Sequence, residues 1–345
     1  MNKNRVAVVI LNWNGSEMMR RFLSSVVSFS SDDADVIVAD NGSTDDSIEM
    51  LQREFPTVRI IGLPENYGFA EGYNKALEGL DAEYFLLLNS DVEVTEGWLK
   101  PLVAYMDAHA EVAACQPKLL SERNREMFEY AGGSGGFIDR YGYPFCRGRV
   151  FTTLEADNGQ YDEPCNLLWA TGAALMVRRD DWKSVGGFDG RFFAHMEEID
   201  FCWRLRSRGR GVVCVPESRV YHVGGATLNA GSPRKTFLNF RNNLLLLYKN
   251  LPEHELRRVL RVRRWLDWLA AFKFLLTDGV AHARAVFEAR REFKARREEF
   301  SPQREENIRL SKVELVPEIM RPSLLRLYYL KHKKTFAELQ RFMQD

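Results

Sequence analysis

The chain has 345 residues, of which 45% are hydrophobic and 28% are charged, and its net charge is zero. This composition is that of an ordinary folded protein, and it excludes disordered, collagen-like and coiled-coil chains. It also excludes a multi-spanning membrane protein, because no stretch approaches the roughly 20 uninterrupted apolar residues that a spanning helix needs.

The zero net charge conceals an uneven distribution. Residues 251–345 carry 21 Lys and Arg against 14 Asp and Glu, a net charge of +7, and the first 250 residues carry −7. The basic end therefore favours an anionic partner such as lipid. We expect no nucleic acid partner, because no recognised binding motif accompanies the basic residues.

Cysteine usage and the N-terminus bear on the compartment. The five cysteines form no CxxC pair, which argues against a disulfide framework or a zinc site and indicates a reducing compartment. The apolar run at 6–11 is too short for a signal peptide. We therefore expect a cytoplasmic protein, peripheral at the inner face of the membrane if the basic end binds lipid.

The first hundred residues alternate between strand and helix patterns. We predict buried strands at 6–11, 36–39, 58–61 and 84–88, and helices at 18–27, 44–55 and 68–80. Such alternation is typical of an α/β fold with a mostly parallel sheet. Polar residues follow three of these strands, at the sheet edge where open α/β sheets bind ligands.

The middle of the chain is less regular. Beyond residue 111 we predict a strand at 170–177, helices at 180–185 and 194–208, and short strands at 212–215 and 220–223. No GxGxxG or GxxxxGK[ST] motif marks a dinucleotide or P-loop site.

After Pro252 a long apolar stripe with helical spacing runs from Trp265 to Phe287, interrupted by Lys273, Asp278 and Arg284. Arginines precede and follow it. Two interpretations stay open. The stripe either packs on the core or on a second copy in a homodimer, or it lies on an anionic membrane surface.

Asp91 closes the segment Asn89-Ser90-Asp91 after the fourth strand. A carboxylate at a sheet edge can hold Mg²⁺ or Mn²⁺ against a diphosphate, or it can merely cap the next helix. His222 is either a structural histidine or, if the fold brings it to Asp91, a metal ligand.

Glu197, Glu198 and Asp200 lie early in a predicted helix. The helix dipole alone favours acidic residues there, but a general base could also occupy this position. The i, i+4 spacing predicts an ion pair between Asp200 and Arg204.

Six sequence blocks resemble one known family. In order they are Val8–Gly15 (VVILNWNG), Val38–Ser47 (VADNGSTDDS), Asn66–Asn74 (NYGFAEGYN), Leu86–Asp91 (LLLNSD), Ala170–Val177 (ATGAALMV) and Gly186–Arg204 (GGFDGRFFAHMEEIDFCWR). Together they resemble the inverting family-2 glycosyltransferases with the GT-A fold, and among them the rhamnosyltransferase-like members. The resemblance implies a GT-A domain over 1–250, followed by a helical extension over 251–345.

The resemblance also implies residue roles. Asp91, in place of the second Asp of the family's Asp-x-Asp, and His222 would bind Mg²⁺ or Mn²⁺. Glu198 falls at the base position, with Glu197 beside it, and Gly172 would shape the acceptor side. The nucleotide-sugar donor would be bound by Leu11, Asn12, Trp13, Asn14, Asp40, Asn66, Gly68, Asn89 and Ser90.

This resemblance implies transfer of a sugar, with inversion, from a nucleoside diphosphate sugar to a glycan or lipid-linked acceptor in cell-surface polysaccharide synthesis. The sequence does not identify the sugar, and rhamnose from a dTDP donor is a guess that rests on the rhamnosyltransferase-like subset alone. One alternative is a sugar-nucleotide nucleotidyltransferase, although the loop at 12–17 lacks the basic residue that such enzymes usually carry. A non-catalytic sugar-nucleotide-binding module is the other.

Overall fold

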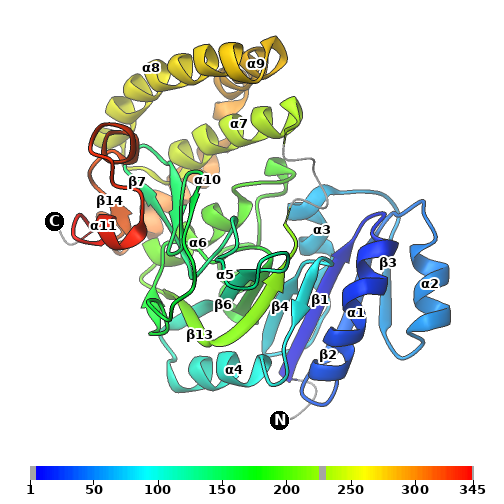
Figure 1. Ribbon diagram of the computed structural model, residues 1–345. Helices are drawn as coiled ribbons and strands as arrows, with labels where there is room; N and C mark the ends of the chain where they lie inside the picture. The colour runs from blue at the N-terminus through cyan, green and yellow to red at the C-terminus, as the bar shows by residue number, and fades with distance from the viewer. Residues whose placement is uncertain (1–4, 225–230, 344–345) are drawn as a thin grey trace.

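The computed structural model describes residues 5–224 and 231–343 (Figure 1). Its centre is one large sheet in the order β11 (Cys165–Asn166), β13 (Gly211–His222), β6 (Val112–Ser121), β12 (Ala174–Arg178), β4 (Tyr84–Leu88), β1 (Val6–Asn12), β2 (Asp35–Asn41) and β3 (Arg59–Leu63). A further strand, β5 (Val92–Val94), pairs with β13. Strands β1–β4, β6 and β13 run in one direction, and β5, β11 and β12 run against them. The predicted mostly parallel α/β fold is confirmed.

The two faces of the sheet bury separate hydrophobic clusters. Along β1 the side chains alternate, so that Val6, Val8 and Ile10 face one cluster, and Ala7 and Val9 face the other. The first cluster is closed by α1 (Ser16–Ser30), α2 (Ser47–Glu54) and α4 (Leu99–Ala108), and the second by α3 (Gly68–Leu77), α5 (Arg179–Ser184), α6 (Glu197–Ser207) and α7 (Pro233–Asn250).

The middle of the chain differs from the predicted elements. The ten-residue strand β6 was not predicted, and the two short strands at 212–215 and 220–223 are one strand, β13, with a register shift between Val215 and Arg219. A second, small sheet has the order β10 (Thr153–Leu154), β9 (Arg149–Val150), β8 (Pro144–Cys146), β7 (Gly136–Asp139) and β14 (Ile319–Met320). Its strands have two to four residues, too few for periodicity to reveal them.

The C-terminal residues pack on the rest of the chain. They form α8 (Glu253–Thr277), α9 (Val280–Arg296), α10 (Ser301–Leu310) and α11 (Phe336–Gln340), and β14 joins the second sheet beside β7. Phe300, Met320 and Phe336 belong to the same hydrophobic cluster as α3 and α6. The domain boundary at 250/251 stays a prediction, because the two parts share one core.

The predicted stripe at 265–287 is divided between two helices, since α8 ends at Thr277 and Gly279 has φ +94°. Within the described residues, no helix has the length and apolar character to cross a bilayer.

Candidate active site

The carboxyl ends of β1 and β2 share a buried hydrogen-bond network. Asn12 Nδ2 donates to Asp40 Oδ1 at 3.0 Å and to Ser43 Oγ at 3.1 Å, and Asp40 Oδ2 accepts from the backbone N–H of Ser43 at 3.0 Å. Asn12 Oδ1 is buried and has no hydrogen-bond partner, which is unfavourable unless a ligand donates to it. The structure therefore brings these two predicted donor residues together, with one acceptor atom available.

The residues that flank Asn12 differ in what they present. Trp13 is 44% exposed, so its ring is accessible to a flat base. Asn14 has φ +50°, and its Oδ1 accepts the backbone N–H of Thr44 at 2.7 Å. The Leu11 side chain packs toward Gly72 of α3, away from the polar network. Trp13 is thus the exposed candidate, and Asn14 holds the loop in place.

Asn66 and Gly68 shape the start of α3. Asn66 Oδ1 accepts from Asn41 Nδ2 at 3.1 Å and from the backbone N–H of Gly68 at 2.8 Å. Gly68 has φ +76°, and a Cβ at this position would lie 2.5 Å from the Phe193 ring. Only glycine satisfies both conditions. Gly68 therefore lets α3 approach the loop that precedes α6.

The segment Asn89-Ser90-Asp91 leaves β4 at the same sheet edge. The backbone N–H of Asn89 donates to Ala173 O at 3.0 Å. Ser90 borders Gly15, as Asn12 does, since a Cβ on Gly15 would lie 3.5 Å from Ser90 Oγ and 2.5 Å from Asn12 Oδ1. This segment thus connects the donor-side network with residues 171–173.

Asp91, His222 and Glu129 form a buried cluster. His222 pairs with Val92 between β13 and β5, which brings its ring to Asp91. His222 Nε2 lies 3.1 Å from Asp91 Oδ1, and Nδ1 lies 3.3 Å from Glu129 Oε1. All three residues are at most 5% exposed. The fold therefore meets the condition under which His222 was predicted to join Asp91, and it adds Glu129, which sequence reasoning missed.

The electrostatics of this cluster favour a positive charge at its centre. Burial lowers the pKa of His222, but Glu129 and Asp91 outweigh it and raise that pKa to about 10. Burial raises the pKa of Asp91, and the hydrogen bond with His222 lowers it below its ordinary value. The Asp91 carboxylate is a fitting ligand for Mg²⁺ or Mn²⁺. His222 would join it only as a neutral imidazole, so a cation bound here would replace the proton on that ring.

The cluster would hold a cation only together with a ligand. In the described part of the chain, no group of three or more His, Cys, Asp or Glu side chains is arranged to hold an ion. A divalent ion commonly completes its coordination with substrate phosphates and water. Asp91 and His222 therefore fit a cation that arrives with a diphosphate.

Glu197 and Glu198 open α6 at the base position that the resemblance implied. Gly172 lies beside Glu198, because a Cβ on Gly172 would be 3.9 Å from Glu198 Cβ. Burial raises the pKa of Glu198 to about 7, and burial and then the neighbouring Glu198 raise the pKa of Glu197 further above its ordinary value. A pKa raised towards neutral pH suits Glu198 to the role of a general base.

The loop before α6 is strained. Phe193, His195 and Met196 have φ of 66°, 70° and 73°, a region that residues other than glycine rarely adopt. The buried amide of Asn242 on α7 holds this loop, because its Nδ2 donates to the carbonyl oxygens of Phe192, Ala194 and His195 at 3.0, 2.8 and 2.8 Å. Asn242 thereby positions the start of α6.

We expect Asn242→Ala to lower the rate of the sugar transfer that the resemblance implies by roughly tenfold or more, with little change in donor affinity, because the loop would relax and move Glu198. It should also lower the free energy of unfolding by about 1–3 kcal/mol, since it leaves buried carbonyl groups without partners. Asn307→Ala is the control, because Asn307 is buried and bonds only to α7 groups. It should lower stability similarly and leave the rate unchanged. Parental transfer by Asn242→Ala would contradict the role.

The predicted Asp200–Arg204 ion pair is confirmed, with Arg204 Nε 2.9 Å from Asp200 Oδ2. Asp200 also receives Lys249 Nζ at 2.8 Å and Asn250 Nδ2 at 2.9 Å. This carboxylate is thus occupied in joining α6 to α7.

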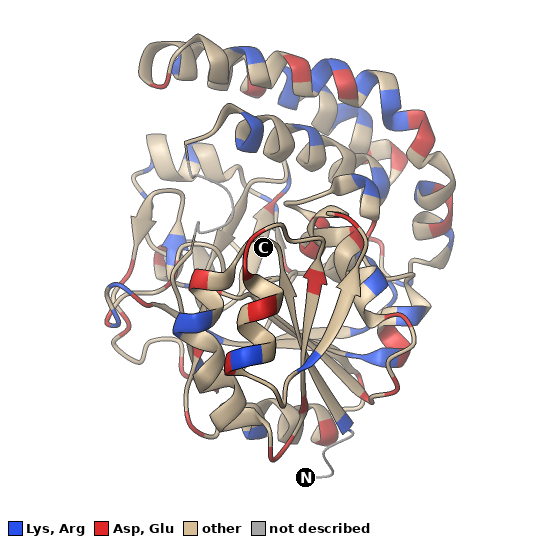
Figure 2. Ribbon diagram, turned by 90° about the vertical axis from the view of Figure 1, so that its right-hand side faces the viewer, with Lys and Arg blue, Asp and Glu red and all other residues tan. Residues whose placement is uncertain are grey.

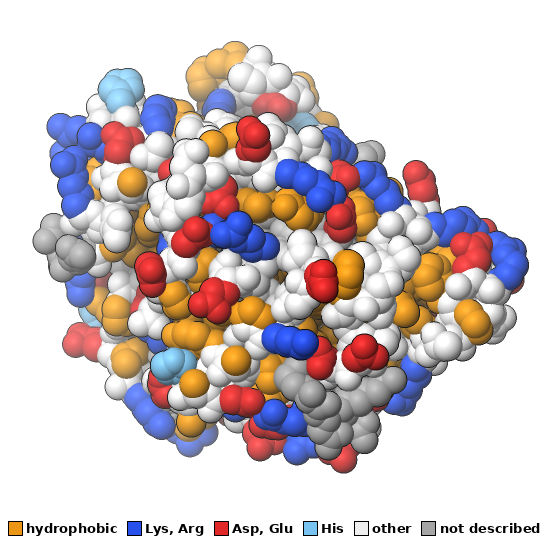
Figure 3. All heavy atoms as spheres, turned by 60° about the horizontal axis from the view of Figure 1, so that its bottom comes forward, with side chains coloured by type: hydrophobic (Ala, Val, Ile, Leu, Met, Phe, Trp, Pro, Cys, Tyr) orange, Lys and Arg blue, Asp and Glu red, His pale blue; other side chains and the backbone are white. Residues whose placement is uncertain are grey.

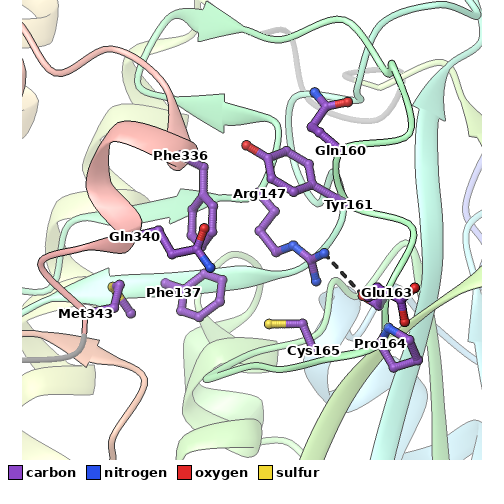
Figure 4. Close-up of a pocket in the computed structure, with 10 residues that line it drawn as sticks. All are labelled: Phe137, Arg147, Gln160, Tyr161, Glu163, Pro164, Cys165, Phe336, Gln340 and Met343. Carbon is purple, nitrogen blue, oxygen red and sulfur yellow. Dashed lines mark hydrogen bonds between the residues drawn. The ribbon is translucent and has the colours of Figure 1, made fainter.

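Two cavities lie apart from these residues. One, of about 360 Å³, lies beside α11, where Figure 4 shows Arg147 next to Tyr161 and Cys165. The other cavity, of about 290 Å³, is lined by Arg140, by Glu255 and by residues between Leu315 and Met343. Neither contains a residue of the candidate site, which is therefore defined by its side-chain contacts.

Known proteins are similar to this chain in sequence. Residues 7–161 match the family model described as Glycosyl transferase family 2. The N-acetylglucosaminyl-diphospho-decaprenol L-rhamnosyltransferase of Mycobacterium tuberculosis (strain CDC 1551 / Oshkosh) is 27% identical over 231 residues, covering 62% of this chain and 75% of that protein. Rhamnosyltransferase WbbL of Escherichia coli (strain K12) is 25% identical over 166 residues, covering 47% of this chain and 61% of that protein.

Solved structures share the fold at low identity. A crystal structure of GalNAc-T7 with UDP, GalNAc and Mn²⁺ has a TM-score of 0.58 and 18% identity, over 74% of this chain and 49% of that chain. A structure of S. aureus TarS 1–349 in complex with UDP-GlcNAc has a TM-score of 0.55 and 16% identity, over 89% of each chain. Both are glycosyltransferases with the GT-A fold.

The chain is therefore a glycosyltransferase with the GT-A fold. Its residues 7–161, less than half of the chain, match the model of glycosyl transferase family 2, whose members transfer with inversion.

Proposed function

We propose that this enzyme transfers a sugar from a nucleoside diphosphate sugar to a hydroxyl of a lipid-linked glycan acceptor, with Glu198 as the base. One observation carries the assignment of residues. The candidate residues form a continuous set of contacts along one edge of the sheet. Asn12 bonds to Asp40, and the Asp91–His222–Glu129 cluster follows at the end of β4. Residues 171–173 then connect this edge with Glu198.

The donor side follows from the strand ends. The base and ribose would lie against Trp13 and Asp40, and Asn12 Oδ1 would accept a hydrogen bond from the ligand. The diphosphate would lie toward Asp91 and His222, and a divalent cation bound there would neutralise the charge that develops on the departing nucleoside diphosphate. Two neighbours in fold support this, one solved with UDP, GalNAc and Mn²⁺ and the other, a mannosyltransferase from Pyrobaculum calidifontis, with GDP-Man and Mn²⁺.

The acceptor side follows from α6. An ionised Glu198 takes the proton of the acceptor hydroxyl as its oxygen attacks the anomeric carbon, and the bond to the diphosphate breaks on the opposite side. Gly172 has no side chain, which leaves space beside Glu198. A Cβ at this position would lie 3.1 Å from the Phe69 ring and would fill that space. No covalent intermediate is needed for inversion.

The relatives support an acceptor class. One named relative acts as an N-acetylglucosaminyl-diphospho-decaprenol L-rhamnosyltransferase, and another is a rhamnosyltransferase. We infer a polyprenyl-diphosphate-linked sugar as acceptor and dTDP-rhamnose as the donor to test first. A thermal-shift screen of UDP, dTDP and GDP, with and without Mn²⁺, tests the donor site. At least one should stabilise the protein in a Mn²⁺-dependent manner, and stabilisation by none would contradict the proposal.

We expect kcat/KM for transfer to rise with pH through about 7. A raised carboxyl pKa means that Glu198 is protonated and inactive as a base below that value and ionised above it. The measurement is transfer at saturating metal from pH 5.5 to 8.5. A profile that is flat, or that falls across this range, would contradict the assignment of Glu198.

A further inference from the structure

The outer face of the α8–α9 hairpin is apolar. More than half of the exposed large hydrophobic side chains in the described chain lie on it, and each is 48–69% exposed: Trp265, Trp268, Leu269, Phe272, Leu275, Leu276, Val280 and Phe287. We call these eight residues the hairpin patch. Contiguous apolar surface of this kind marks an interaction site.

The patch is held outward by contacts on the inner side of the hairpin. Ala271, Ala283 and Val286 form a small cluster there, packed against Phe240 of α7 and Phe274. Asp267 on α8 is buried and forms ion pairs with Arg263 of the same helix and with Arg290 of α9. Ala283 and Val286 of the predicted stripe therefore pack inward on α7, whereas the eight residues of the hairpin patch face outward.

Cations without an ion-pair partner in the described chain lie beside the patch, most of them at one end of the hairpin. Arg258, Arg261 and Arg264 precede Trp265 on α8, and Lys273 and Arg291 lie further along the hairpin. All five are exposed, and no carboxylate of residues 5–224 or 231–343 forms an ion pair with any of them. In Figure 2 the charged segments of the uppermost helices gather toward one end, and the other end is mainly uncharged.

Another face of the molecule lacks this pattern. On the face shown in Figure 3, acidic and basic side chains are interspersed among small hydrophobic patches. Such a mixture is usual for a surface in contact with water. The hairpin patch, with its cations, is therefore a distinct surface.

The hairpin lies on the ligand side of the sheet. In Figure 1 the parallel strands β1 and β4 point with their carboxyl ends toward the part of the molecule that contains α7, α8 and α9. A partner surface in contact with the hairpin would consequently face the carboxyl ends of the parallel strands, where Asn12 and Asp91 lie.

We propose that the hairpin patch and its unpaired cations dock the enzyme on an anionic membrane surface. Tryptophan and phenylalanine enter the interface between headgroups and acyl chains, and arginine and lysine attract anionic headgroups. A second copy of the chain is a poorer partner, since it would bring the same unpaired cations together. The biological purpose of docking rests on the proposed function, because a lipid-linked acceptor would then lie beside the donor site, whereas lipid binding itself depends only on the hairpin.

Flotation of the full chain with vesicles, without donor or acceptor, tests the proposal. Vesicles of phosphatidylcholine with phosphatidylglycerol should bind the parent, those of phosphatidylcholine alone should bind it less, and added salt should weaken binding. The double variants Trp265→Ser/Phe272→Ser and Arg261→Glu/Arg264→Glu should each reduce binding to anionic vesicles by roughly tenfold or more. Phe29→Ser and Arg59→Glu, at exposed positions on α1 and β3, are the matched controls and should bind as the parent does.

Thermal shift with the nucleoside diphosphate that stabilises the parent verifies that each variant is folded. Failure of the parent to bind anionic vesicles, or undiminished binding by folded double variants, would overturn the proposal. A parental dimer in sedimentation that both double variants convert to monomer would also overturn it, because the patch would then join two copies. A chain that floats and transfers no sugar would contradict the proposed function alone.

Discussion

Glu198→Gln is expected to reduce the rate of sugar transfer by a factor of roughly 10² or more, the usual contribution of general acid–base catalysis. The substitution keeps the size of the side chain and removes its proton acceptor. Donor affinity should remain near that of the parent, because the base contacts the acceptor hydroxyl and not the diphosphate. The measurement is transfer to acceptor, alongside donor affinity from calorimetry.

Glu197→Gln is the matched control, one residue away on the same helix. Burial and the neighbouring Glu198 raise the Glu197 pKa and favour its neutral form, which glutamine resembles, so this variant should lose little activity. If Glu198→Gln stays active and Glu197→Gln loses activity, the base is Glu197 and not Glu198. Full activity in both variants would exclude this cluster as the base.

Asp91→Ala is expected to abolish the Mn²⁺-dependent stabilisation by a nucleoside diphosphate. A ligand present at about 100 times its Kd stabilises the folded state by about 2.7 kcal/mol, and the share that depends on the metal should disappear. The substitution also leaves His222 with Glu129 as its remaining acidic neighbour. Thermal shifts of parent and variant, with nucleotide, with Mn²⁺ and with both, measure the effect.

Glu93→Gln provides the comparison for Asp91→Ala. Glu93 lies two residues further along the chain, and its carboxylate pairs with Arg125 at the surface. This variant should retain the parental response to metal and nucleotide. If Asp91→Ala responds to Mn²⁺ with nucleotide as strongly as Glu93→Gln does, Asp91 is not a metal ligand.

The fold was predictable where elements are long and apolar. The runs at 6–11, 36–39 and 84–88 correspond to β1, β2 and β4, because strands buried on both faces appear as continuous apolar segments. The strands of the second sheet are too short to produce a pattern. The division of the stripe into α8 and α9 depends on the positive φ of Gly279, which helical periodicity alone does not reveal.

The candidate site was predictable only in part, for a related reason. Asp91 and Glu198 lie in blocks that resemble the family, and the pairing of β13 with β5 brings His222 to Asp91. Glu129 and Asn242 lie outside those blocks, and their partners are distant in the sequence. Only tertiary structure brings such residues together. A buried polar side chain near a predicted site is identifiable only once the fold is known.

The most direct test of the central claim is a transfer assay with the full chain, Mn²⁺, a nucleoside diphosphate sugar and a polyprenyl-diphosphate-linked acceptor. The assay follows nucleoside diphosphate release and the anomeric configuration of the product. We expect one donor, dTDP-rhamnose first, to give a product of inverted configuration with one equivalent of nucleoside diphosphate, and the Glu198→Gln variant to give far less of it. A product that retains the donor's configuration, or release of pyrophosphate from a nucleoside triphosphate without sugar transfer, would contradict the account.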